Sequence, residues 1–128
     1  MKTLFLAGLS AGVLLALSTS AFAGDAAHGQ QIFRSQCGVC HQGGDGDGDG
    51  GQAPSLRGVI GRKVGGDPDF AYTQPLTDAK DKWTEEALAN FISDPQKTYP
   101  GTAMPIKVSS PDDRADIAAY LATLKPAR

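Results

Sequence analysis

The feature that most constrains the fold is a long irregular segment in the middle of the chain. Residues 43–82 contain 10 glycines and 3 prolines, and they show no sustained alternation of apolar and polar residues that would predict a sheet. Irregular connections of this length are uncommon in a compact domain unless a function requires them. We therefore expect a large bound group to organise this segment.

Two stretches with helical character flank this segment. Asp25 can cap a first helix, which runs up to a pair of cysteines and carries on one face Ile32, Phe33 and Cys37. Thr84 can cap a second helix, which ends at Pro95. Its inward-facing residues are Leu88, Phe91 and Ile92.

A third helix near the end of the chain has the clearest start signal. Ser110 suits the N-cap position, Pro111 the first helical position, and Pro126 closes the segment. Apolar residues recur at the spacing of one helical face: Ile117, Tyr120, Leu121 and Leu124. We predict an all-α fold of three main helices with long loops wrapped around an apolar cofactor.

The first 23 residues have the layout of an export signal, with a lysine at position 2, an apolar stretch over residues 4–17 and Ala21-Phe-Ala23 at the end. An uncleaved anchor is the alternative, but a membrane-spanning helix needs about 20 apolar residues. We predict cleavage and a periplasmic mature chain, residues 24–128, that forms a single domain. It keeps 11 basic and 14 acidic residues, a formal charge of −3, and its scattered basic residues argue against a nucleic-acid partner.

The two cysteines belong to a Cys-x-x-Cys-His motif, which is the spacing for covalent haem attachment. Thiols three residues apart on a helical turn lie along one edge of the ring, where they add to its vinyl groups, and the next histidine turns its imidazole to the iron. We predict one haem c, attached through Cys37 and Cys40, with His41 as an iron ligand.

Other uses of this motif fit the chain less well. A disulfide between positions three apart closes too small a loop to stabilise a fold much. A structural zinc site needs four ligands, and beyond the motif the mature chain offers only His28 as a further Cys or His. A thioredoxin-like redox pair follows a strand in a βαβ pattern, and we find no such strand. A bare redox or structural pair remains the alternative.

The function then depends on the sixth position of the iron. Met104 is the only methionine after the initiator, and it lies in a loop that two prolines and a glycine hold, Tyr99-Pro-Gly-Thr-Ala-Met-Pro105. A lone methionine can fill a gap in a core, but a rigid loop favours a ligand. Iron closed by a thioether passes electrons, whereas open iron would indicate a peroxidase or a gas-binding cytochrome, and these remain the alternatives.

Five blocks of the mature chain resemble a known family and occur in its order. Gly29 and Phe33 precede the cysteine motif, and Tyr120 lies in the last helix. After Cys37-Gly-Val-Cys-His41, the five blocks are Pro54-Ser-Leu-Arg-Gly58, Gly61-Arg-Lys63, Phe70-Ala-Tyr-Thr73, Trp83 and Pro100-Gly-Thr-Ala-Met104. Over nearly the whole mature sequence the chain resembles class I c-type cytochromes of the mitochondrial and bacterial c2 kind. The resemblance implies the class I cytochrome c fold and a soluble monohaem electron carrier that cycles Fe(II)/Fe(III) and is not an enzyme.

The resemblance also implies a role for each matching residue. His41 and Met104 would be the axial ligands, and the carbonyl of Pro54 would accept the other ring N–H of His41. Gly29 would let Tyr120 approach closely where the first and last helices cross, because a glycine inside a helix costs about 1 kcal/mol relative to alanine and calls for a packing reason. The haem propionates would lie among Arg62, Tyr72, Thr73, Trp83 and Thr102; ordinary core or surface roles are the alternatives for this set.

The chain departs from the family in its pocket and on its docking face. Phe91 and Leu76 replace a frequent tyrosine and asparagine, so we expect a reduced buried polar network. In the mitochondrial members, lysines on this face steer the protein to acidic partners. Lys97 is retained here, but the other matching positions are Gln31, Gln36, Gln96 and Ala103. We expect a monomer that makes transient contact with redox donors and acceptors, including membrane complexes. The docking faces of these partners should be neutral or basic.

The run Asp45-Gly-Asp-Gly-Asp-Gly50 has the start of a calcium loop. With Asp45 at position 1, Gly50 falls at the required position 6, but position 12 is Leu56 instead of a bidentate glutamate. Pro54 and the further glycines also do not provide flanking helices. We predict a solvated acidic loop beside the haem attachment site, with weak cation binding as the alternative.

Overall fold

The computed structural model describes residues 23–48 and 50–126, so all but the last residue of the predicted export signal lie outside the described residues. The elements in chain order are α1 (Ala26–Ile32), a π-helical segment η1 (Phe33–Cys37), α2 (Gln74–Thr77), α3 (Glu85–Ser93), α4 (Pro95–Thr98) and α5 (Pro111–Thr123). In these ranges the only β pairing is an isolated bridge between Lys63 and Lys82. The all-α prediction is confirmed.

The three main helices begin where the capping residues predict. The Asp25 carboxylate accepts hydrogen bonds from the backbone N–H groups of residues 27 and 28, the Thr84 hydroxyl from residue 87, and the Ser110 hydroxyl from residue 113. Two differences stand out. The first helix changes to π-helical pairing over its last turn before Cys37, and the four-residue helices α2 and α4 are not among the predicted elements. No helix in the described part of the chain is long and apolar enough to cross a bilayer.

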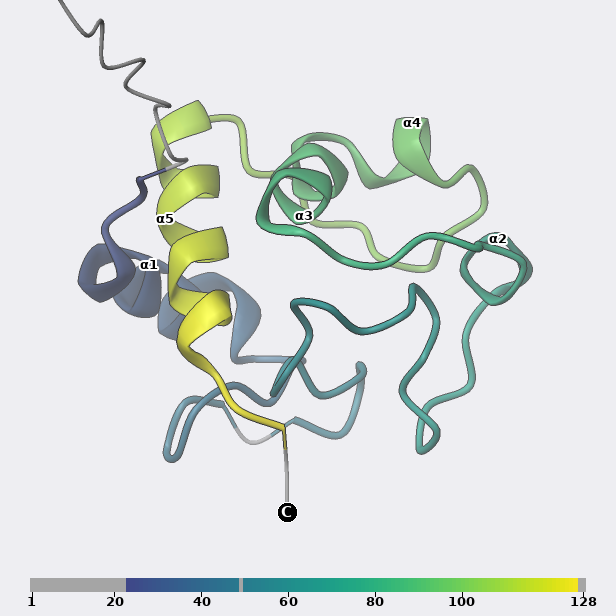
Figure 1. Cartoon of the computed structure of the whole chain (residues 1–128), viewed down its shortest axis with the longest axis horizontal. Helices are drawn as coiled ribbons and strands as arrows, with labels where there is room; N and C mark the ends of the chain where they lie inside the picture. Colours follow the sequence, from purple (N-terminus) through teal and green to yellow (C-terminus); the bar gives the residue numbers. More distant parts are fainter. Residues whose placement is uncertain (1–22, 49, 127–128) are drawn as a thin grey trace, which may run out of the picture.

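Helix α5 crosses α1 at Gly29, as Figure 1 shows for the two helices. A Cβ atom at Gly29 would lie 1.9 Å from the carbonyl oxygen of Asp116, which no side chain could tolerate. The two helices cross at Gly29 as expected, but the atoms of α5 nearest to Gly29 belong to the backbone of Asp116 and Ile117 instead of to Tyr120. The Tyr120 ring lies one turn further along α5, with its centroid 5.4 Å from that of Phe33.

Polar contacts tie down the same crossing at its edge. The Asp116 carboxylate accepts a hydrogen bond of 2.6 Å from the backbone N–H of Asp25 and pairs with Nδ1 of His28 at 2.8 Å. The hydrogen bond to Asp116 raises the pKa of His28, and that to His28 lowers the pKa of Asp116. Both side chains lie at or near the surface, so we regard the pair as a modest fastening of the chain to α5.

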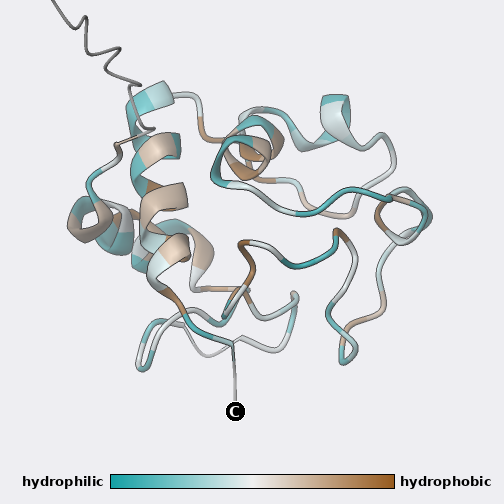
Figure 2. Cartoon of the chain, viewed as in Figure 1, coloured by the Kyte–Doolittle hydropathy of each residue, from teal (hydrophilic) through white to brown (hydrophobic). Residues whose placement is uncertain are grey.

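The apolar core lies between these two helices, α3 and the long middle segment. Figure 2 shows hydrophobic colours on α3 and α5 and mostly neutral or hydrophilic ones on the loop that follows the cysteine motif. The most deeply buried apolar side chains come from η1, the middle segment and α5: Phe33, Val59, Val64, Ile117, Ala118 and Leu121. A 105-residue domain has a limited core, and here that core also forms the wall of a central cavity.

The acidic loop differs from the prediction of a solvated loop. Asp45 is exposed, with a side chain 96% accessible that pairs with Arg57, but Asp47 is only 1% exposed. The Asp47 carboxylate accepts hydrogen bonds from Arg34, from the Tyr120 hydroxyl and, at 2.8 Å, from the Gln30 amide. It lies just beneath the surface, because the Arg34 side chain that covers it is itself half-exposed.

This network closes the loop over the Cys-x-x-Cys-His motif. The backbone N–H of Gly44 donates to the Tyr120 hydroxyl at 3.1 Å, and the backbone N–H of Gly43 donates to the carbonyl oxygen of Asp47 at 2.8 Å. Gly48, at φ +85°, passes so close to the motif that a Cβ would lie 2.4 Å from the carbonyl oxygen of His41. A calcium ion bound by Asp47 would have to compete with the contacts that its carboxylate makes to three side chains, which adds a physical reason to reject the calcium loop.

The ionisation of Asp47 predicts an acid-dependent loss of stability. Burial raises the pKa of the Asp47 carboxyl, but the hydrogen bonds from Tyr120, Gln30 and Arg34 outweigh it and hold the pKa below its ordinary value. Because the pKa is lower in the folded than in the unfolded chain, the stabilisation is present above the unfolded value of about 3.9 and is lost as the pH falls through the folded value. We expect Asp47→Asn to cost about 2–3 kcal/mol at neutral pH.

Equilibrium denaturation of the haem-bound protein at several pH values measures this effect. The difference between the parent and Asp47→Asn should begin to shrink below about pH 4, where the carboxyl group of the unfolded chain becomes protonated, and should be lost as the pH falls through the lower pKa of the folded parent. Asp45→Asn in the same loop is the matched control and should change stability by less than about 0.5 kcal/mol. A deficit for Asp47→Asn that stays constant down to acid pH would show that its charge plays no part.

Candidate functional site

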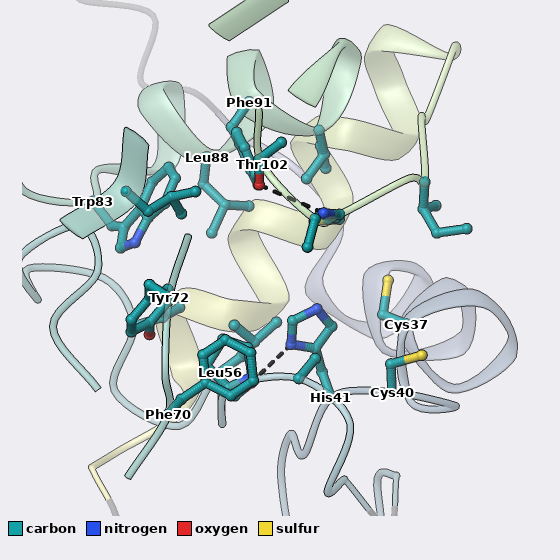
Figure 3. Close-up of a pocket in the computed structure, with 18 of the residues that line it drawn as sticks. Cys37, Cys40, His41, Leu56, Phe70, Tyr72, Trp83, Leu88, Phe91 and Thr102 are labelled. Carbon is teal, nitrogen blue, oxygen red and sulfur yellow. Dashed lines mark hydrogen bonds between the residues drawn. The ribbon is translucent and has the colours of Figure 1, made fainter. Parts of the chain in front are cut away.

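A cavity of about 430 Å³ lies at the centre of the domain, and mostly apolar side chains line it. It is bounded by the cysteine motif, the middle segment, α3, the loop before α5, and α5 itself (Figure 3). All ten residues predicted for the site line this one cavity: Cys37, Cys40, His41, Pro54, Arg62, Tyr72, Thr73, Trp83, Thr102 and Met104. Residues up to 67 positions apart in sequence are thus brought to one place.

The cysteine motif follows directly from the π-helical segment. The backbone N–H of Gly38 bonds to Phe33 at 2.7 Å, five residues back, and those of Cys40 and His41 both bond to the carbonyl of Cys37. This turn places both sulfur atoms at the same edge of the cavity (Figure 3). Burial, with a smaller contribution from Cys40, raises the pKa of the Cys37 thiol to about 11.

The imidazole of His41 is fixed by one strong hydrogen bond. Its Nδ1 lies 2.7 Å from the carbonyl oxygen of Pro54, which can only accept, so Nδ1 carries the proton and donates. The other ring nitrogen, Nε2, is then the unprotonated one and faces the cavity (Figure 3). Burial lowers the pKa of His41, against the smaller raising effect of the Pro54 hydrogen bond, and this keeps the ring neutral. A neutral imidazole with a fixed tautomer is the form that binds a metal.

The loop that carries Met104 lies on the opposite side of the cavity. In Figure 3 Thr102 lies with Phe91 and Leu88 on one side, and His41 lies with Leu56 and Phe70 on the other. Thr102 is buried, and its hydroxyl accepts a hydrogen bond of 3.5 Å from the backbone N–H of Met104. The half-buried Met104 side chain lines the same cavity.

Polar groups gather at the end of the cavity that is remote from the cysteines. Trp83 and Arg62 are brought together by backbone pairing, with the Trp83 N–H bonded to the Arg62 carbonyl at 2.8 Å. The Arg62 guanidinium donates to the carbonyl of Ser55 at 2.7 Å, but its Nε is buried without a partner in the described structure. The hydroxyl of Thr73 is likewise buried and unpartnered.

Tyr72 completes this polar end. Its hydroxyl oxygen accepts a hydrogen bond of 3.3 Å from the backbone N–H of Asp67, which leaves the phenolic hydrogen available for donation. Burial raises the pKa of Tyr72, so the hydroxyl keeps this hydrogen at neutral pH. In Figure 3 Tyr72 and Trp83 lie near each other, across the cavity from the cysteines.

This donor set fits a haem. Buried polar groups without partners are rare in folded proteins, and two of them here line an otherwise apolar cavity. A flat apolar ring with two carboxylates would satisfy both features, since the ring contacts the apolar walls and the carboxylates accept from the buried donors. Two thiols at one edge and an oriented imidazole on one face are the remaining elements that covalent attachment requires.

The two departures from the family both lie at this cavity. Leu76 and Phe91 are buried and line it, and Phe91 packs with ring centroids 5.2 Å from Trp83 and 5.8 Å from Tyr99. The cavity wall is therefore apolar where tyrosine and asparagine are frequent in the family.

Two positions of structural importance were not predicted from the sequence. Asp47 is indistinguishable in the Asp-Gly run from the exposed Asp45, and only the fold places Arg34 and Tyr120 around it. Gln96 looks like a surface residue that replaces a lysine, but its side-chain amide bonds to the loop of Met104. A single sequence carries no signal for either contact, because both depend on how loops fold back onto helices.

Comparisons with known proteins agree with this site. The family model described as cytochrome c matches residues 26–125. Cytochrome c2 of Rhodomicrobium vannielii is 38% identical over 114 residues, covering 88% of this chain and 90% of the relative, and cytochrome c of Tetrahymena pyriformis is 44% identical over 99 residues, covering 77% and 87%.

Solved structures give the same result. Cytochrome cH from Methylobacterium extorquens superimposes with a TM-score of 0.69 at 36% identity, covering 78% of this chain and 99% of that protein. Cytochrome c2 from Rhodobacter sphaeroides superimposes with a TM-score of 0.72 at 29% identity, covering 83% and 100%. The chain therefore belongs to the cytochrome c family: it is an electron carrier rather than an enzyme, and it holds one haem c covalently through Cys37 and Cys40.

Proposed function

We propose that His41 and Met104 are the two axial ligands of the haem iron in this chain. The observation that carries the proposal is the 2.7 Å hydrogen bond from His41 Nδ1 to Pro54, which leaves Nε2 unprotonated and facing the cavity, opposite the loop of Met104. When bound, the haem supplies the one-electron Fe(II)/Fe(III) couple, and a thioether ligand favours the reduced state relative to harder ligands.

The remaining residues of the site would hold the propionates and keep water from the ring. Arg62 Nε and the Thr73 hydroxyl are buried donors without partners, and Tyr72 has a free phenolic hydrogen. The indole N–H of Trp83 is a further donor at the same end, and the buried Thr102 hydroxyl lies on the Met104 side. Both faces of the cavity have apolar walls, so small ligands would reach the iron only if a ligand loop moved.

Replacing the proposed thioether ligand tests the axial pair. We expect Met104→Ala to lose the weak far-red absorption band that marks methionine ligation of ferric haem, to bind carbon monoxide in the reduced form and to have a lower reduction potential. The parent should show the band and bind little carbon monoxide. Ile106→Ala in the same loop is the control and should keep the band.

An open iron site would give a different pattern. If the freshly prepared parent lacked the far-red band and bound carbon monoxide readily when reduced, Met104 would not be a ligand. A gas-binding role would then have to be considered in its place.

We further propose that residues 1–23 are a cleaved export signal and that residues 24–128 are the mature periplasmic domain. Lys2, the apolar stretch over residues 4–17 and Ala21-Phe-Ala23 support this proposal. Gly24, the first residue after the proposed cleavage site, already belongs to the folded domain, since a Cβ on it would lie 2.2 Å from the carbonyl oxygen of Ala115 in α5.

N-terminal sequencing and intact mass of the protein expressed in a bacterium with haem-attachment machinery test this proposal. We expect Gly24 to be the first residue and the haem protein to appear in the periplasmic fraction. Ala23→Leu, which replaces the small residue at the proposed site, should slow processing. Recovery of a membrane-bound protein that retains Met1 would favour the uncleaved anchor.

The partners are proposed to be redox proteins with neutral or basic docking faces that contact this monomer transiently near the cysteine edge. Val39 and Ile106 are the large apolar side chains most exposed in the described structure, at 68% and 43%. Val39 lies between the two cysteines, Ile106 lines the cavity, and the uncharged Gln36 and Ala103 line it as well. A rim with apolar and uncharged groups favours partners selected by contact more than by long-range attraction.

Reduction by small charged reagents can measure the charge of this rim. We expect rates with anionic ferrocyanide and with cationic hexaammineruthenium(II), followed by stopped flow, to change less than about threefold between low and physiological salt. Gln36→Lys should accelerate the anionic reagent and make it salt-sensitive, whereas Lys80→Gln, a substitution outside the residues that line the cavity, should leave both rates unchanged. A parent rate with ferrocyanide that falls steeply with salt would reveal a positive rim and an acidic partner.

A further inference from the structure

The side-chain amide of Gln96 in α4 makes two hydrogen bonds to the loop that carries Met104. Gln96 Nε2 donates to the backbone carbonyl of Thr102 at 2.6 Å, and Gln96 Oε1 accepts from the backbone N–H of Gly101 at 3.1 Å. An amide offers a donor and an acceptor side by side, so it can bridge one free N–H and one free C=O of a turn. Lysine, which the mitochondrial family members carry here, has only donors and could not make the second contact.

The bridged residues lead directly to Met104. Thr102 is buried, its N–H bonds to the carbonyl of Tyr99 at 3.0 Å, and its hydroxyl accepts from the N–H of Met104 at 3.5 Å. Gly101 has φ +94°, so the turn needs a conformation that side chains rarely adopt. A contact that holds residues 101 and 102 therefore also restricts the backbone that presents the Met104 side chain.

A second contact holds the other arm of the same loop. The Asp94 carboxylate caps α4 by accepting from the N–H of Lys97 at 3.2 Å, and it pairs with the ammonium group of Lys107 at 2.8 Å. Gln96 and Asp94 thus fasten the loop on both sides of Met104 to the same short helix. The Asp94 pair is exposed and is screened by salt, whereas the neutral amide contact is not.

We propose that Gln96 is a positioning residue for Met104: its amide holds the loop closed over the iron and so opposes replacement of the thioether by an external ligand. The proposal rests on Met104 being the axial ligand. The resemblance implies only that Gln96 replaces a docking lysine, whereas the proposal gives this side chain a role in holding the Met104 loop. Opening the loop must break both amide contacts, so their loss raises the population of the open form.

Imidazole binding to the ferric haem-bound protein measures that population. An external ligand binds only the open form, so its apparent affinity is proportional to the open fraction. We expect Gln96→Leu, which keeps the bulk of the side chain and removes both hydrogen bonds, to bind imidazole about five- to tenfold more tightly than the parent. Gln96→Glu keeps the acceptor for the N–H of Gly101 but loses the donor to the carbonyl of Thr102. It should therefore also bind imidazole more tightly than the parent.

The matched control is Gln31→Leu, the same substitution at an exposed glutamine of α1. It should change imidazole affinity by less than about twofold, which separates the amide contact from a general effect of surface leucine. Gln96 is itself exposed, so its variants should fold, and far-UV circular dichroism checks this. The far-red band of Gln96→Leu should also disappear at a lower imidazole concentration than that of the parent.

Two results would overturn different statements. If the parent shows methionine ligation and Gln96→Leu binds imidazole no more tightly than the parent, or no more tightly than Gln31→Leu, then Gln96 does not position Met104. If the parent itself lacks the methionine band, the axial ligand is wrong and the fastening loses its target. The parent spectrum therefore distinguishes failure of this inference from failure of the proposed function.

Discussion

The crossing of α1 and α5 at Gly29 is the contact on which the rest of the structure depends. Because no side chain separates the two backbones there, α1 packs directly against α5 and continues into η1. That continuation places Cys37, Cys40 and His41 at one side of the cavity, while α5 supplies Ile117 and Leu121 to its floor. Adding a single methyl group, as in Gly29→Ala, would therefore displace the haem attachment motif, although Gly29 itself lies outside the pocket.

The long middle segment is ordered by side chains and by single backbone contacts instead of by a sheet. The carbonyl of Pro54 is bonded to His41, the guanidinium of Arg62 to the carbonyl of Ser55, and the backbone of Trp83 to that of Arg62. Each of these contacts also orients a group at the cavity. The same residues thus order the loop and form the site. This explains why a small domain can contain such a long irregular segment.

Much of this arrangement is predictable from the sequence, and the exceptions share a cause. Capping residues such as Asp25, Thr84 and Ser110 act locally, so they mark the helix starts correctly. The ten site residues were identified by family-like blocks, and the fold gathers them in one cavity. Asp47 was misjudged because its burial depends on Arg34 and Tyr120, which approach from two helices. The contact of Gly29 with the backbone of Asp116 was not predicted for the same reason, since a packing partner in a distant helix cannot be read from spacing.

The burial of Cys37 has a consequence for the order in which the protein matures. The Cys37 side chain is only partly exposed and lines the cavity, and α5 contributes Ile117 and Leu121 to the wall of that cavity. Covalent attachment is therefore favoured on a chain whose pocket is still open. Helix α5 is synthesised last and supplies one wall, so its docking onto α1 would be the step that closes the domain around a haem already attached.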